Sequence, residues 1–190
     1  KITLLFCLMS AALQAQSFEW LQTPPISFDM NPDGIAYPSA VDASGNVYVT
    51  GFQDTPIPYN DIMGNVFFNK YDASGNLVFS HALNGAVMVY EMATDNNGNV
   101  LMAVGYLNSI ILGNIGLITI NQGVQHLLVK YSPTGELIWY QPIELDDSVV
   151  NDFHALTTDT AGNIYIGYDD YNYSYIAKLD PDGVRAFTIT

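Results

Sequence analysis

The sequence predicts an all-β protein built from four-stranded repeats. The segment Asp-Ala-Ser-Gly-Asn occurs at 42–46 and again at 72–76, and each copy lies between short runs of alternating apolar residues. Asp followed by Gly-Asn favours a tight β-turn, because the Asp side chain bonds to nearby backbone and glycine accepts a positive φ. The β-branched and aromatic residues on either side favour strands. Each copy therefore predicts a β-hairpin.

Two hairpin types alternate along the chain. The turns of the first type begin and end at Asp42 and Gly45, Asp95 and Gly98, and Asp159 and Gly162. The second type follows a lysine, and its lysines and turn residues are Lys70, Asp72 and Gly75; Lys130, Ser132 and Gly135; and Lys178, Asp180 and Gly183. The first-type turns are 53 and 64 residues apart, whereas the lysines are 60 and 48 apart. The turns keep their length while the connections vary, as surface loops do, so the repeat is four strands in two hairpins.

Repeated four-stranded units of roughly 40–50 residues or more predict a β-propeller, in which each unit is one blade. We expect blades at 38–82, 89–143 and 153–190. A β-sandwich is the alternative, although that fold does not require repeated turn sequences.

An aromatic residue lies four positions after each second-type glycine, at Phe79, Trp139 and Phe187. Residues 17–22 look like the same outer strand, with Trp20 in this position, 59 residues before Phe79. In a closed propeller such an orphan strand completes the last blade and leaves no open edge. We therefore expect about three blades plus one orphan N-terminal outer strand, a partial ring that further blades of the same chain complete. Alone, the partial ring is expected to expose blade faces and self-associate.

The repeat resembles the bacterial β-propeller repeat called SBBP. Residues 40–51 (AVDASGNVYVTG) and 67–83 (FFNKYDASGNLVFSHAL) carry the resemblance, which covers most of 38–190 in three copies. NHL repeats share only the first half of this pattern. The third copy departs from it, with Leu179 in place of Tyr and Val184-Arg185 in place of an apolar strand start. The resemblance implies an exported, surface-associated protein, and it transfers no catalytic residue because the family has no general catalytic motif.

The N-terminus has the layout of a secretory signal peptide, predicted at residues 1–16. Lys1 precedes an apolar run at 2–13, and small and polar residues follow. This run of twelve residues spans ~18 Å as a helix, too little for a bilayer core of ~30 Å. A buried N-terminal helix is the alternative. Cleavage would remove Cys7, the one cysteine, and leave a secreted or cell-surface chain that inserts in no membrane.

The charge of the chain argues against two classes of partner. Beyond residue 16, four basic residues face 19 acidic ones. An anionic surface of this size repels nucleic acid and acidic membranes, so neither is an expected partner. The unknown partner is expected to be a protein or a carbohydrate.

No metal or other cofactor is expected. His81, His126 and His154 share no ligand spacing. The turn that begins at Asp95 is rich in oxygen but has Tyr106 where a calcium loop carries its bidentate carboxylate.

The loop at 168–175 is the predicted ligand-binding site. Aromatic rings stack on sugars or peptides while carboxylates accept their hydrogen bonds, and this loop combines the two in Tyr168, Asp169, Asp170, Tyr171, Tyr173 and Tyr175. The alternative is that these tyrosines pack between blades.

The sequence thus predicts an exported, non-enzymatic β-propeller module for binding, structural or adhesive roles at the cell surface or beyond. The alternative is an exported propeller enzyme that acts on polysaccharide, with loop carboxylates such as Asp146 and Asp169 as acid and base.

A structural role is also predicted for the repeated lysines. Each stem is expected to pack on apolar neighbours, with the ammonium near a carboxylate: Asp72 for Lys70 and Asp180 for Lys178. Lys130 has Ser132 at that position and must find another partner. The alternative is a ring of lysines that binds an anion.

Overall fold

A computed structural model describes residues 38–53, 65–118, 123–143, 152–170 and 172–190. Within these residues there are fourteen strands, four antiparallel sheets and no helix, so the predicted all-β class is confirmed. No helix in the described part of the chain is long and apolar enough to span a membrane. The predicted signal peptide at 1–16, the outer strand at 17–22 with Trp20, the carboxylates of 144–147 and Tyr171 lie outside the described residues.

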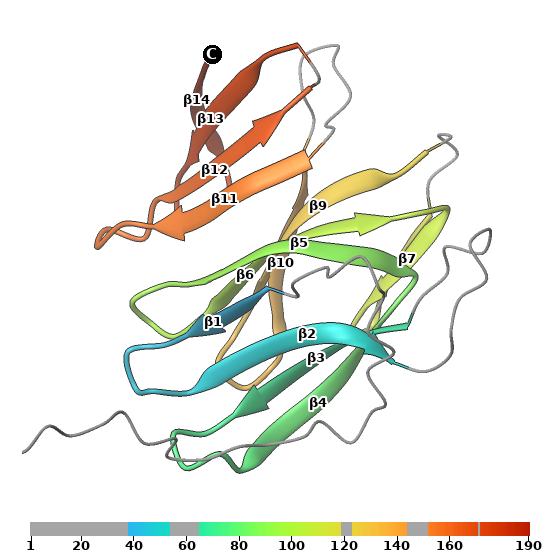
Figure 1. Ribbon diagram of the computed structural model, residues 1–190, viewed down its shortest axis with the longest axis vertical. Helices are drawn as coiled ribbons and strands as arrows, with labels where there is room; N and C mark the ends of the chain where they lie inside the picture. Colours follow the sequence, from blue (N-terminus) through green and yellow to red (C-terminus); the bar gives the residue numbers. More distant parts are fainter. Residues whose placement is uncertain (1–37, 54–64, 119–122, 144–151, 171) are drawn as a thin grey trace, which may run out of the picture.

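Three of the sheets have four strands each, and they follow one another along the chain (Figure 1). The first contains β1 (Ser39–Val41), β2 (Val47–Gln53), β3 (Asn65–Tyr71) and β4 (Leu77–Asn84) in that order. The second contains β5 (Ala86–Thr94), β6 (Val100–Tyr106), β9 (Gln125–Tyr131) and β10 (Leu137–Pro142). The third contains β11 (Asp152–Thr158), β12 (Ile164–Asp169), β13 (Ser174–Leu179) and β14 (Arg185–Ile189).

The first strands of neighbouring sheets lie side by side, β1 against β5 and β5 against β11. This arrangement is compatible with a β-propeller-like fold, in which successive sheets are arranged about a common axis. The fourth sheet is a hairpin of β7 (Ser109–Leu112) and β8 (Ile115–Ile118), inserted between β6 and β9. The repeat pattern does not predict this insertion.

The six repeated turns share one geometry, which confirms the hairpin prediction. In the turn at Asp72, the amide of Gly75 donates to the Asp72 carbonyl, and the amides of Ser74 and Asn76 donate to Asp72 Oδ1. The Asn76 side chain donates to the other carboxylate oxygen at 2.9 Å. The turn glycines all have φ between +75° and +85°, a region that other residues enter only with strain.

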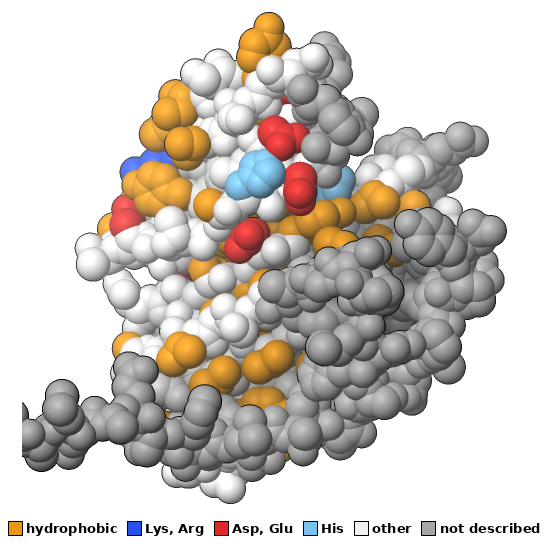
Figure 2. Space-filling view, in the orientation of Figure 1, with side chains coloured by type: hydrophobic (Ala, Val, Ile, Leu, Met, Phe, Trp, Pro, Cys, Tyr) orange, Lys and Arg blue, Asp and Glu red, His pale blue; other side chains and the backbone are white. Residues whose placement is uncertain are grey.

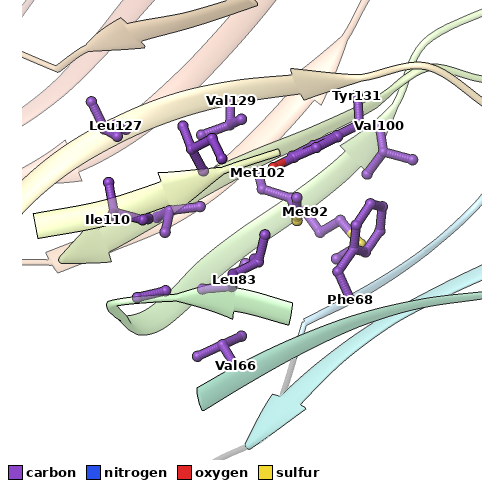
Figure 3. Packing of buried hydrophobic residues seen from close by; sticks show 14 of the residues in the cluster. Val66, Phe68, Leu83, Met92, Val100, Met102, Ile110, Leu127, Val129 and Tyr131 are labelled. Atoms are coloured by element: carbon purple, nitrogen blue, oxygen red, sulfur yellow. The ribbon is translucent and has the colours of Figure 1, made fainter. Parts of the chain in front are cut away.

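Two apolar cores fill the spaces between the sheets. The first lies between the first and second sheets and extends to β7; its members include Val66, Phe68, Met102, Val129 and Tyr131 (Figure 3). The second lies between the second and third sheets and is built from other residues, Leu101, Leu128, Ile164, Ile166 and Leu179 among them. The strands of the second sheet contribute to both cores. Successive side chains of a strand point to opposite faces of the sheet, so alternate residues enter the first and the second core.

Candidate functional site

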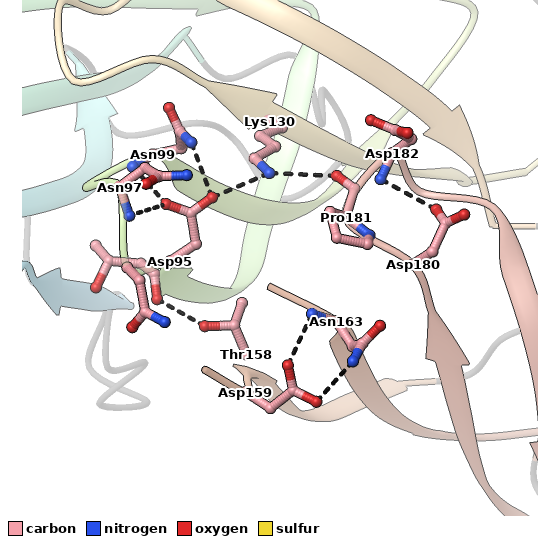
Figure 4. Close-up of polar contacts among 12 residues, drawn as sticks. Asp95, Asn97, Asn99, Lys130, Thr158, Asp159, Asn163, Asp180, Pro181 and Asp182 are labelled. Carbon is pink, nitrogen blue, oxygen red and sulfur yellow. Dashed lines mark hydrogen bonds and ion pairs between the residues drawn. The ribbon is translucent and has the colours of Figure 1, made fainter. Parts of the chain in front are cut away.

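Two of the repeated lysines, Lys70 and Lys130, connect their sheet to the next. Lys70 Nζ donates to the Pro133 carbonyl at 2.8 Å, and Lys130 Nζ donates to the Pro181 carbonyl at 3.2 Å. Both carbonyls belong to the second-type turn of the following sheet. Lys130 also pairs with Asp95 at 3.0 Å, and the two side chains are only 8% and 4% exposed (Figure 4).

The predicted lysine partners Asp72 and Asp180 are wrong. Each of these carboxylates accepts backbone amides of its own turn, which holds it away from the lysine. In the described part of the chain, neither Lys70 nor Lys178 has a carboxylate within salt-bridge distance. Their ammonium groups lie over the rings of Tyr48 and Tyr165, 5.2 and 5.4 Å from the ring centroids. The alternative of an anion-binding lysine ring also fails, because Lys70 and Lys130 donate to different turns.

The first-type turns use either a tyrosine or a lysine as an additional donor. Tyr48 Oη donates to Asp42 at 3.2 Å, and Tyr165 Oη donates to Asp159 at 3.1 Å. The second sheet has Leu101 in the tyrosine position, and there Lys130 contacts Asp95 directly.

Hydrogen bonds also hold these turn aspartates in their charged form. Burial works to raise the pKa of Asp95, but hydrogen bonds from Asn99 and Lys130 outweigh it and lower the pKa. At Asp42 hydrogen bonds likewise outweigh burial and lower the pKa, and hydrogen bonds also lower the pKa of Asp159, so the aspartates of the first-type turns favour the charged form.

Hydroxyl groups make a further series of contacts along the first strands. Thr94 Oγ1 donates to the Val41 carbonyl at 2.9 Å, and Thr158 Oγ1 donates to the Thr94 carbonyl at 3.0 Å. Each threonine immediately precedes a first-type turn, so the contact between sheets repeats with the sequence.

The repeated aromatic residues pack on the next sheet. A Cβ added to Gly135 would lie 3.2 Å from the Phe79 ring, and one added to Gly183 would lie 3.0 Å from the Trp139 ring. Glycine is therefore required at these turns both by its φ and by the ring beneath it. Phe187, in the third copy, is 47% exposed.

Four ionisable residues that the sequence did not predict to lie together gather on β5, β11 and β12. We call them the inner-strand cluster: Glu91, Asp152, His154 and Asp169. His154 Nε2 lies 2.6 Å from Asp169 Oδ2, and its side chain is 53% exposed. Figure 2 shows histidine and acidic side chains beside one another on this face.

The charges of the cluster influence one another. The hydrogen bond with Asp169 is the main cause that raises the pKa of His154. Burial, and then the negative charge of Asp152, raise the pKa of Glu91. The cluster therefore combines a histidine that favours its charged form with a carboxylate that protonates more readily than usual.

His126 lies close to the cluster but is partly buried among aromatic rings. It is within hydrogen-bond distance of Tyr90 Oη, at 3.3 Å, and its ring packs against Tyr90 and Phe153. Burial lowers the pKa of His126 to about 4, against the opposing charge of Asp152. No group of three or more His, Cys, Asp and Glu side chains in the described residues is arranged to hold a metal ion.

The predicted binding loop divides into packed and exposed residues. Tyr168 is buried and stacks on Tyr175, with ring centroids 5.2 Å apart. Asp170 accepts hydrogen bonds from the amide of Tyr173 and the hydroxyl of Tyr175, so it closes the loop. Tyr173 is 66% exposed. Of the predicted binding residues that the structure describes, Tyr173 is therefore exposed and Asp169 partly exposed, whereas Tyr168, Asp170 and Tyr175 pack within the sheet and its loop.

Comparisons with known proteins identify no family. No protein-family model and no curated protein sequence matches the chain. Among solved structures, it is similar to a chain from a structural and mechanistic analysis of two prolyl endopeptidases, with 9% identity and a TM-score of 0.31. That likeness covers 81% of this chain and 28% of the other chain. At this TM-score it carries no argument about fold or activity.

Proposed function

We propose that this chain is part of an exported β-propeller of SBBP-like repeats, a non-enzymatic module for binding or adhesion at the cell surface or outside the cell. The observation that carries the proposal is that the same contacts recur between each sheet and the next. Lys70 and Lys130 each donate to a proline carbonyl of the following sheet, and Thr94 and Thr158 each donate to a first-strand carbonyl of the preceding one. Equal contacts at each step favour a regular rotation from sheet to sheet.

The same contacts support a binding or structural role over catalysis. The repeated Asp, Lys, Tyr and Thr side chains are engaged in turns and in contacts between sheets. The exposed aromatic Tyr173, close in sequence to Asp169, suits a sugar or a peptide, because a ring stacks and a carboxylate accepts hydrogen bonds.

The rival function is an enzyme that acts on polysaccharide. The pair of His154 and Asp169, with Asp152 and Glu91 nearby, is the observation that favours it. A carboxylate with a raised pKa can donate a proton, and a second carboxylate can act as base or nucleophile.

A panel of polysaccharides and peptides tests both functions on the purified chain. We expect saturable binding without turnover, weakened in Tyr173→Ala and unchanged in Phe187→Ala, a matched exposed aromatic on β14. If a polysaccharide is turned over and this activity is lost in Asp169→Asn and in Glu91→Gln, the enzyme function is correct and the binding-module proposal is wrong. Export is tested separately, by the mass of the chain made in a bacterial host: we expect the loss of residues 1–16.

We also propose that further blades of the same chain pack on the third sheet. Phe79 and Trp139 are partly covered by the next sheet, whereas the equivalent Phe187 is exposed. Lys178 lies over Tyr165 and, among the described residues, donates to no turn carbonyl. We expect residues 1–190 alone to self-associate as concentration rises, and Phe187→Glu to reduce this. A monodisperse monomer at high concentration with cooperative melting would contradict the proposal.

A further inference from the structure

The space between the second and third sheets contains a cavity of about 300 Å³. Leu128, Ile166, Tyr168, Ala177 and Leu179 form much of its wall. This volume lies at the lower end of the range for small-molecule sites, which are mostly apolar with a few polar groups.

Comparison of equivalent repeat positions explains why the cavity exists. In the first inter-sheet space, the rings of Phe68 and Tyr131 meet with centroids 5.4 Å apart, and Val129 packs in the same core (Figure 3). Counted from the repeated lysine, Phe68 corresponds to Leu128, Tyr131 to Leu179 and Val129 to Ala177. All three replacements are smaller, and all three line the cavity.

The cavity lining also differs from the preceding repeat at two larger residues. Tyr168 replaces Val104 and lines the cavity together with Ile166. Arg185 replaces Leu137, a residue that packs on the first core. Arg185 is exposed and lines the cavity, as does Gln141.

An arginine in this position favours an anionic ligand. Beyond residue 16 the chain has four basic residues against 19 acidic ones, and this one replaces an apolar residue of the repeat. The guanidinium group matches the geometry of a carboxylate better than an ammonium does. The missing volume corresponds to aromatic side chains, so the body of the ligand has the shape of a ring.

We propose that this cavity is a binding site for a small monocyclic aromatic carboxylate. The ring occupies the apolar space between the second and third sheets, equivalent to the space that Phe68 and Tyr131 fill between the first two, and the carboxylate pairs with Arg185. The site is separate from the exposed Tyr173, so it does not depend on the function proposed above.

Titration calorimetry of the full chain with 3-phenylpropionate tests the site, with 3-phenylpropionamide as the neutral match. We expect a dissociation constant on the order of 0.1–1 mM for the carboxylate. Arg185→Leu, which restores the residue of the other repeats, should weaken carboxylate binding about tenfold and leave amide binding unchanged. Arg185→Lys should recover part of the loss. An equal effect on carboxylate and amide, or no effect on either, would overturn the role of Arg185.

Two variants fill the cavity with the side chains of the preceding repeat: Leu128→Phe and Ala177→Val. Each should raise the melting temperature and weaken binding of both probes at least tenfold. Ala82→Val, at an exposed position on β4, is the matched control and should change neither. Undiminished binding in a folded cavity-filling variant would place the ligand elsewhere and overturn the proposal.

Methyl NMR of the unmodified chain supplies a readout that needs no variant to fold. We expect 3-phenylpropionate to shift the methyl signals of Leu128, Ile166 and Leu179 in a saturable way. The absence of saturable shifts, or shifts confined to other methyl groups, would show that the cavity is not a site for this class of ligand.

Discussion

Replacing Lys130 by methionine removes a buried cation while keeping its apolar stem. Its ammonium lies 3.0 Å from Asp95, and the two side chains are 8% and 4% exposed. Removal of one partner from a buried ion pair typically costs about 3–5 kcal/mol. Asp95 retains hydrogen bonds from the amides of Asn97 and Asn99 and from the Asn99 side chain, so its charge is not left without partners. We therefore expect the lower end of the range, about 3 kcal/mol.

The equivalent substitution Lys70→Met is the matched control. In the described part of the chain Lys70 has no carboxylate partner; it donates to the Pro133 carbonyl and lies over Tyr48. Loss of a hydrogen bond to a charged group costs about 1.5 kcal/mol at the low end. Denaturant unfolding should thus separate the two variants by roughly 1.5 kcal/mol, with unchanged m-values.

A second substitution in the same background tests the mechanism. Leu101→Tyr places a hydroxyl where Tyr48 and Tyr165 donate to their turn aspartates, so it should restore about 1 kcal/mol to Lys130→Met. The loss of folding stability at low pH gives an independent readout. Because the folded-state pKa of Asp95 is lowered, its contribution is present above the unfolded pKa of 3.8 and is lost as pH falls through the folded value. Lys130→Met should move that loss to higher pH. Equal stabilities of Lys130→Met and Lys70→Met, or no rescue by Leu101→Tyr, would refute the reasoning.

Three other predictions follow from the site and the turns. The pKa of His126 is about 4 in the folded chain against 6.5 unfolded, so stability should fall by about 2 kcal/mol, after allowance for solvent screening, between pH 6.5 and 4; His126→Gln should flatten this slope. Gly135→Ala should cost about 2–3 kcal/mol in denaturant unfolding, because φ is +85° and a Cβ would lie 2.4 Å from a histidine side chain, whereas Gly113→Ala, with open space, should cost about 1 kcal/mol. Asp169→Asn should lower the pKa of His154, seen by NMR titration, because their hydrogen bond is the main cause that raises it.

The sequence predicted those features of the fold that depend on local chemistry. The turn at Asp72 closes through atoms within four residues of one another, so its residues are sufficient to indicate it. The hairpin of β7 and β8 was missed because its turn at Gly113 lacks the repeated sequence. The lysine partners were wrong because nearness in sequence suggested Asp72 for Lys70, whereas the turn already uses that carboxylate and the lysine reaches the next sheet.

The inner-strand cluster and the cavity depend on contacts that cross between strands and sheets. His154 and Asp169 lie on adjacent strands, and Glu91 approaches them only because β5 packs beside β11. The cavity likewise involves Leu128 and Leu179, which are ordinary apolar residues when each is considered alone. Its sequence signal is a difference between copies, visible only when equivalent positions are compared.

Differences between copies are therefore of two kinds, and they have different meanings. At Leu101 the change is compensated, since the repeated lysine of that sheet, Lys130, takes the place of a tyrosine hydroxyl as donor to the turn aspartate. At Leu128 and Leu179 the change is uncompensated, since the lost ring volume remains as open space. A compensated change preserves the packing of the repeat, whereas an uncompensated change costs packing energy that nothing else in the described core replaces. The repeated residues of this scaffold hold neighbouring sheets together. Selection for a ligand is therefore expected to act where packing is lost without compensation, and Arg185 lines that same cavity.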